Sequence, residues 1–224
     1  MSGAHIAPVH RVLLPRLLLV ADGFVAGRAD MPAEEVRSRV RQAVEAGVAW
    51  VLLRDHGAEE DHFAMEAAAM VDDLRTIEPS IILSIGRHVE MARALGTGVH
   101  TGREGPGVAE AREVIGLTQP VGYSAHAGEE AAAEARAGAD YILLGPVFET
   151  RSHPGWPPLG TGALADAAHA AGAVPVYAIG GVTPERAPAC REAGAYGVAV
   201  LGGILDAPAT RVGEYLAALR PAEG

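Results

Sequence analysis

Cysteine and aromatic residues are scarce in this chain of 224 residues, which has Cys190 as its one cysteine and 4% aromatic side chains. A single cysteine excludes a disulfide framework and a cluster of metal-binding thiolates. We interpret Cys190 as a packing residue, because it falls in a helical pattern. The scarcity of aromatic rings leaves little surface on which the bases of single-stranded nucleic acid can stack.

Positive charge is also in deficit, and the formal net charge is −10. This charge repels nucleic acid and anionic membrane surfaces, so we expect neither as a partner. The apolar stretch near the start, residues 13–21, is interrupted by Pro15 and Arg16 and is too short to cross a bilayer. No cleavable signal follows it, which predicts a cytoplasmic protein. A phosphorylated substrate must then be held by local donors against the overall field.

Apolar residues are abundant, at 49%, and lie in short runs that alternate with helical segments. After a loose leader over residues 1–12, eight strand-and-helix units follow over residues 13–224 without a linker. Near-continuous apolar strands separated by helices indicate a parallel sheet buried on both faces. A doubly wound open sheet is the alternative, but eight units favour a single α/β domain, a (β/α)8 TIM barrel. The expected strands are residues 16–21, 49–55, 81–85, 98–102, 120–126, 140–145, 174–180 and 195–202.

Two glycine pairs end the last two expected strands, Gly180-Gly181 and Gly202-Gly203. A strand that stops at Gly-Gly and enters a helix presents backbone N–H groups at the positive end of the helix dipole. TIM barrels frequently bind phosphate in the loops after strands seven and eight. We therefore predict a phosphate site whose donors are the N–H groups of Gly180, Gly181, Leu201 and Gly202. The alternative is that both pairs are ordinary turn glycines.

Polar residues gather at the carboxyl ends of the expected strands, the rim where TIM barrels carry their active sites. Arg54, which ends the second strand, is a candidate anion clamp. His126 ends the fifth strand just before a helix, where the dipole disfavours the imidazolium and leaves a neutral ring that can move a proton. The alternative for His126 is a residue that caps or hydrogen-bonds the following helix.

Five histidines lie at strand ends and raise the question of a metal site: His56, His88, His100, His126 and His153. Ligand clusters usually include a carboxylate or a short His-x-His spacing, whereas each of these histidines follows a different strand. We therefore predict no metal ligands.

Seven segments resemble, in order and spacing, the thiamin phosphate synthase/TenI superfamily over about residues 16–205. They are LLRDHG, SIGRHVEMA, GVHTGRE, GYSAH, ADYILLGPVFET, VYAIGGVTPE and GAYGVAVLGGI. The resemblance implies a TIM barrel with one of two activities. Synthases join a pyrimidine diphosphate to a thiazole phosphate with the help of Mg²⁺. TenI-type tautomerases aromatise a carboxythiazole phosphate.

The synthase pattern is only partly present. Arg54, Ser124, Thr150, Ser152 and the Gly180-Gly181 pair match it. These positions belong to what both activities share, including the end of the pocket that holds the thiazole phosphate. They do not separate a synthase from a tautomerase.

The departures from the synthase pattern lie elsewhere on the rim. Gly86 and Gly105 stand where synthases carry two Mg²⁺-binding aspartates, and His56 and His153 stand where they carry lysines. A diphosphate leaving group develops charge that Mg²⁺ and lysines stabilise, so these replacements should disable synthase chemistry.

The TenI-type tautomerases match better, through a glycine before Arg87 and the VFET segment. The resemblance then implies that His126 is catalytic and shuttles the proton, while Arg54 and Arg87 are candidate partners of the substrate carboxylate. No cofactor is expected, and Mg²⁺ enters only if the synthase alternative holds. The expected partner is a small phosphorylated thiazole, and a homodimer is possible.

Three other functions stay open. The first is a synthase with a displaced metal site, and the second is a non-catalytic regulator that binds thiazole phosphate. The third is an unrelated phosphosugar isomerase on the same fold. Such isomerases usually need a glutamate base at a strand end, and the one candidate, Glu149, belongs to the VFET segment.

Overall fold

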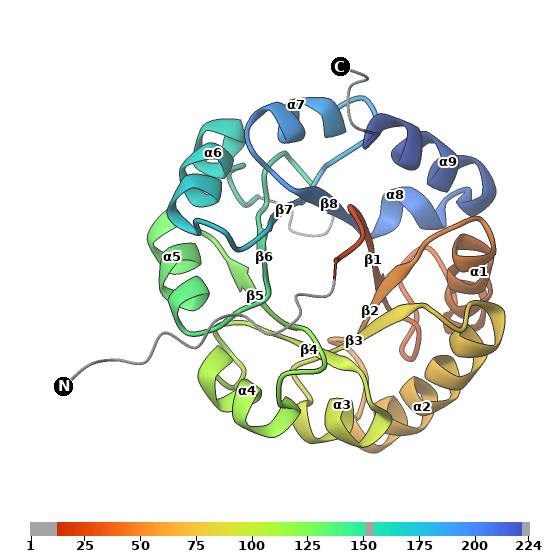
Figure 1. Ribbon diagram of the computed structural model, residues 1–224. Coiled ribbons are helices and arrows are strands. Elements are labelled where there is room, and N and C mark those ends of the chain that lie inside the picture. The colour runs from red at the N-terminus through yellow and green to blue at the C-terminus, as the bar shows by residue number, and fades with distance from the viewer. Residues whose placement is uncertain (1–12, 151–154, 221–224) are drawn as a thin grey trace.

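The computed structural model describes residues 13–150 and 155–220. The predicted leader and residues 151–153 of the strand-six loop lie outside the described residues. Eight parallel strands close into a barrel in chain order, because β1 pairs with both β2 and β8. Helices form a ring around the strands (Figure 1). The predicted TIM barrel is confirmed.

The strands lie close to their predicted ranges and have the bounds β1 Leu17–Asp22, β2 Trp50–Arg54, β3 Ile82–Gly86, β4 Gly98–Thr101, β5 Val121–Ala125, β6 Tyr141–Leu144, β7 Val176–Ile179 and β8 Gly197–Val200. The helices are α1 Ala33–Glu45, α2 Glu60–Ile77, α3 Val89–Leu95, α4 Val108–Ile115, α5 Gly128–Arg136, α6 Gly160–Ala170, α7 Ala187–Glu192, α8 Gly202–Leu205 and α9 Pro208–Ala218. Helix α8 was not predicted, because four residues are too few to show a helical period.

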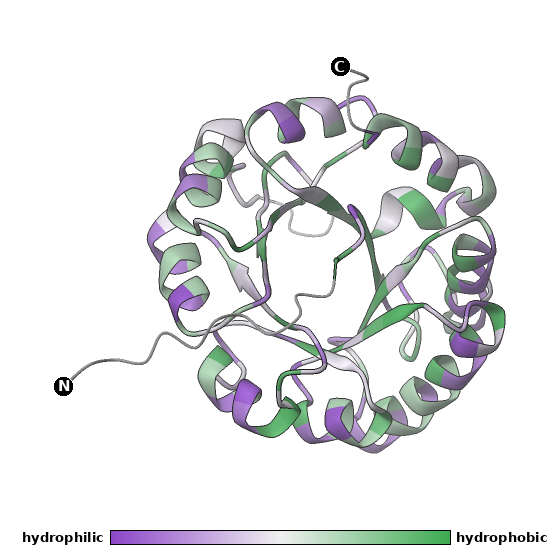
Figure 2. Ribbon diagram, in the orientation of Figure 1, coloured by the Kyte–Doolittle hydropathy of each residue, from purple (hydrophilic) through white to green (hydrophobic). Residues whose placement is uncertain are grey.

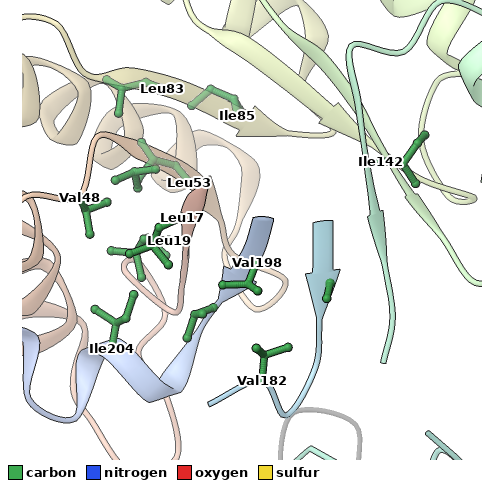
Figure 3. Close-up of a cluster of buried hydrophobic side chains, with 14 of the residues drawn as sticks. Leu17, Leu19, Val48, Leu53, Leu83, Ile85, Ile142, Val182, Val198 and Ile204 are labelled. Carbon is green, nitrogen blue, oxygen red and sulfur yellow. The ribbon is translucent and has the colours of Figure 1, made fainter. Parts of the chain in front are cut away.

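Both faces of the strands are buried, which explains their continuous apolar runs. Along β1, Leu17 and Leu19 belong to the cluster between strands and helices, whereas Leu18 and Val20 belong to the cluster inside the barrel. The cluster that contains Leu17 and Leu19 therefore packs the ring of helices against the barrel, and part of it is drawn in Figure 3. The helices are apolar toward the strands and polar toward the outside (Figure 2).

Much of the barrel interior is filled by three of the chain's few aromatic residues. The ring of Trp50 lies edge-on to those of Tyr141 and Tyr177, at centroid distances of 4.6 and 5.4 Å. All three side chains are fully buried. The barrel is therefore a packed core whose layers support the rim above them.

Candidate functional site

One cavity of about 540 Å³ lies at the carboxyl ends of the strands. Eight of the nine predicted site residues line it: Arg54, Ser124, His126, Thr150, Gly180, Gly181, Leu201 and Gly202. They come from the ends of β2, β5, β6, β7 and β8, and parallel strands in a closed barrel bring these ends together.

Arg87, the ninth predicted residue, lines a separate, shallower hollow with His88 and Met91. Its φ of 64° is left-handed, and its backbone N–H donates to the carbonyl of His100 at 2.9 Å. Its guanidinium lies 3.6 Å from the Glu104 carboxylate. The sequence placed Arg87 beside Arg54 on the rim, but its side chain does not share the main cavity.

His126 is held in one orientation by its neighbours. Its Nδ1 lies 2.6 Å from the carbonyl oxygen of Gly145, and its backbone N–H donates to Glu130 at 2.8 Å. A carbonyl only accepts, so Nδ1 carries the hydrogen, and Nε2 is the nitrogen of the neutral ring that can take up a proton. The ring of Trp156 lies 5.9 Å away and is half exposed at the mouth of the cavity.

Ser124 is tied to a buried histidine that the sequence placed on the rim. The His100 Nε2 lies 2.8 Å from the Ser124 hydroxyl, and its Nδ1 lies 3.1 Å from the hydroxyl of Tyr141. Burial, with a smaller contribution from the Arg54 charge, lowers the pKa of His100 to about 3. A neutral imidazole between two hydroxyls therefore fixes the Ser124 side chain, which lines the cavity.

Arg54 already has a carboxylate partner. Its Nε and Nη2 donate to one oxygen of Asp22 at 3.1 and 2.8 Å, and the two residues are paired in register on β1 and β2. Both side chains are about one-fifth exposed. Nearby, burial and then the Arg54 charge lower the pKa of His56. The Arg54 charge is thus largely balanced within the protein.

The glycine pair after β7 is required by the backbone. Gly180 and Gly181 have φ values of 90° and 63°, in the left-handed region. A Cβ on Gly180 would lie 2.6 Å from Pro146, and one on Gly181 would lie 2.9 Å from the Phe148 side chain. The loop after β6 packs directly on this turn, so a side chain at either position would push the two loops apart.

Two features of the site were not predicted from the sequence: Arg28 and the structural role of Asp55. Arg28, in the loop after β1, lines the cavity beside Gly202. The buried Asp55 carboxylate accepts the backbone N–H groups of Val25 and Ala26 at 2.8 and 2.9 Å, which fastens that loop to the end of β2. The position of Asp55 next to Arg54 was the one sequence signal for it, and Arg28 gave none.

The residues present do not fit the magnesium site that the synthase alternative implies. Gly86 and Gly105 carry no carboxylate, and a Cβ on Gly86 would lie 3.3 Å from the aliphatic stem of Arg54. A Cβ on Gly105 would make an ordinary contact with the stem of Arg87, at 3.7 Å. Over residues 13–150 and 155–220, no three His, Cys, Asp or Glu side chains are grouped so that they could hold a metal ion.

Comparison with known proteins places the chain among proteins with thiamine-related names. A family model described as thiamine monophosphate synthase (TMP-TENI) matches residues 22–204. The chain is 36% identical over 174 residues to a thiamine-phosphate synthase of Bacteroides fragilis, and the match covers 75% of this chain and 84% of that protein. It is 34% identical over 191 residues to a thiamine-phosphate synthase of Geobacillus thermodenitrificans, over 83% of this chain and 84% of that protein.

Solved structures support the fold. A thiamine phosphate pyrophosphorylase from Pyrococcus furiosus superposes with a TM-score of 0.76, over 93% of this chain and 97% of that one, at 24% identity. None of the helices in the described residues is both long and apolar enough to span a membrane. The barrel and the sequence matches over most of its length lead to one conclusion: the chain belongs to the thiamine monophosphate synthase/TenI family of thiamine-biosynthesis enzymes.

Proposed function

We propose that this protein is a thiazole tautomerase, which aromatises carboxythiazole phosphate by moving one proton. The observation that carries the proposal is the fixed His126 imidazole, with Nδ1 bound to the Gly145 carbonyl, in the cavity that Gly180 and Gly202 line. The absence of carboxylates at Gly86 and Gly105 supports it, because a tautomerisation needs no metal ion.

The chemistry requires one base that returns the proton it takes. Nε2 of neutral His126 removes the proton from the ring carbon that bears the carboxylate. The electron pair of that C–H bond moves through the ring system, and the imidazolium then delivers the proton to the exocyclic carbon. One C–H bond breaks and one forms, no electrons leave the substrate, and aromaticity supplies the driving force. A positioned base of this kind typically contributes 10²–10⁴-fold in rate.

Substrate binding uses both sides of the cavity. Backbone N–H groups of Gly180, Gly181, Leu201 and Gly202 hold the phosphate and fix the ring near His126. On the other side, Ser124, Thr150 and Arg54 face the heterocycle and its carboxylate. Arg54 uses Nε and Nη2 for Asp22, and the Nη1 donors are assigned to the substrate.

Thiamine-phosphate synthase is the second candidate, because the relatives at 36% and 34% identity carry that name. The names favour it, whereas the residues at the expected metal positions do not. A non-catalytic protein that binds thiazole phosphate is a third candidate, with the same phosphate site and no use for a base at His126.

The test is an absorbance assay of aromatisation with the carboxythiazole phosphate tautomer as substrate. We expect the unmodified protein to accelerate aromatisation and His126→Asn to lower kcat by at least about 100-fold. His169→Asn is the matched control, because His169 is exposed on α6 and does not line the cavity, and it should keep full activity.

The competing functions give different results in a parallel assay with pyrimidine diphosphate, thiazole phosphate and Mg²⁺. Thiamine phosphate formation without tautomerase activity would overturn the proposal in favour of the synthase. Binding of thiazole phosphate with no turnover in either assay would overturn it in favour of the regulator.

A further inference from the structure

We propose that Arg28 binds the substrate phosphate directly, as a side-chain partner of the glycine turn at Gly202. This inference rests on the proposed function only in placing a phosphate at that end of the cavity. It adds a charged side chain to a predicted phosphate site whose other donors are backbone N–H groups.

Arg28 differs from the other arginines of the cavity in its hydrogen bonding. The Nη1 atom of Arg28 is buried and makes no hydrogen bond to any residue that the structure describes. Arg186 donates to the Gly181 carbonyl at 2.8 Å, and Arg211 donates to Glu214 at 2.8 Å. A buried donor without a partner is costly, and an anion in the cavity would satisfy it.

Two glycines make the space that Arg28 occupies. A Cβ on Gly23 would lie 2.6 Å from the Arg28 Cγ, and a Cβ on Gly202 would lie 3.2 Å from its Nη2. The stem therefore crosses one glycine and the guanidinium reaches the backbone of the other. This arrangement places the positive charge beside the turn whose N–H groups we assign to the phosphate.

The loop that carries Arg28 is fixed before any ligand binds. Arg28 and Met31 exchange backbone hydrogen bonds at 2.7 and 3.2 Å, and Asp55 holds the N–H groups of Val25 and Ala26. Because the backbone is anchored on both sides of the arginine, little conformational entropy remains to be lost on binding.

The charge of the chain explains why a bound phosphate needs a cation such as Arg28. The chain carries a net charge of −10, and three carboxylates line the cavity together with three further arginines: Glu149, Glu185 and Asp206, and Arg54, Arg186 and Arg211. A phosphate dianion needs a compensating cation close to it in such a field. The Asp30 partner of Arg28 is exposed, at 3.3 Å from Nε, and does not use Nη1. The guanidinium therefore keeps a donor and much of its charge for the ligand.

The test measures binding of inorganic phosphate by isothermal titration calorimetry in the full chain. Arg28→Gln keeps most of the stem and removes the charge, and we expect it to raise the Kd for phosphate at least about tenfold. Arg28→Lys should lie between Arg28→Gln and the unmodified protein. Arg93→Gln, which removes an equal charge from an exposed position on α3, should leave the Kd unchanged. A thermal melt of each variant checks that it is folded.

A second titration separates phosphate binding from effects on the heterocycle and from the proposed reaction. Thiazole phosphate should bind Arg28→Gln at least about tenfold more weakly, while the thiazole alcohol, which lacks the phosphate, should bind both proteins alike. His126→Asn should bind inorganic phosphate normally, so loss of tautomerase activity alone does not affect this inference. An unchanged phosphate Kd in folded Arg28→Gln, or an equal loss of alcohol binding, would overturn it.

Discussion

The two halves of the rim are built in different ways. After β7 and β8 the cavity lining includes glycine backbone, with Gly180, Gly181 and Gly202 at the turns. Across the barrel, after β2 and β3, the prominent groups are arginines that already have acidic partners, Asp22 for Arg54 and Glu104 for Arg87.

This difference shows where a ligand anion gains most. Backbone N–H groups at a glycine turn are fixed donors, whereas a paired arginine must share its charge. We therefore assign the phosphate to the glycine half and a weaker, orienting role to Arg54. The following predictions test this division of the rim, and they begin with the largest effect.

The substitution Gly181→Ala tests the half of the rim that carries the glycine turns. The left-handed φ of 63° and the 2.9 Å approach to Phe148 together predict a loss of about 3 kcal/mol in the free energy of unfolding. Thiazole phosphate binding should fall with it. Gly162→Ala on α6 is the control, since no atom lies within 4 Å of its added methyl group, and it should stabilise the helix slightly. Urea titration of both variants checks the difference, and equal stabilities would contradict it.

His100 lies between the halves and predicts a pH dependence of stability. Burial keeps the pKa of His100 at about 3 in the folded protein, below the value of 6.5 that it regains on unfolding. The unfolded chain therefore binds the proton first, so this contribution is complete above pH 6.5 and is lost as the pH falls toward 3. Its expected slope is about 1.4 kcal/mol per pH unit.

The measurement is urea unfolding between pH 7 and pH 5, compared with His100→Gln. His56 and His88 also have lowered pKa values through burial, so the unmodified protein should show a steeper slope than His100 alone gives. In His100→Gln the slope of the unfolding free energy against pH should be smaller by the contribution of His100. Identical slopes in the two proteins would show that folding does not lower the pKa of His100.

The Arg54 and Asp22 pair tests the side-chain half and has the smallest expected effect. A double-mutant cycle with Arg54→Met and Asp22→Asn should give a coupling of about 1–2 kcal/mol, because both groups are only about one-fifth exposed. Inorganic phosphate binding should change less in Arg54→Met than in Arg28→Gln. A larger change in Arg54→Met would move the phosphate to the opposite half.

Most of the fold could be predicted from the sequence, because each strand is a short apolar run between helical segments. The alternation of Leu17 and Leu19 with Leu18 and Val20 was present in the run but could not be assigned to two faces. All four residues are apolar, and only barrel closure decides which side of β1 faces the helices. Helix α8 was too short to leave a periodic signal.

The candidate site could be predicted where it follows strand ends and could not where it depends on contacts. His126, Ser124 and the glycine pairs were found because the carboxyl ends of parallel strands share one edge. Arg87 was placed on the same edge, but its side chain lines a different hollow. Arg28 lies in a long loop. A loop has no helical or strand period, so the sequence does not predict which way the Arg28 side chain points.

By itself the sequence determined the eight-unit barrel, the glycine turns after β7 and β8, and a histidine at the end of β5. These are consequences of local patterns, which act over a few residues. The tertiary structure decided which charges are already paired, which histidine is buried, and that Arg28 enters the cavity. The reason is physical: the availability of a charged group depends on partners that are distant in the chain, as Asp22 is from Arg54.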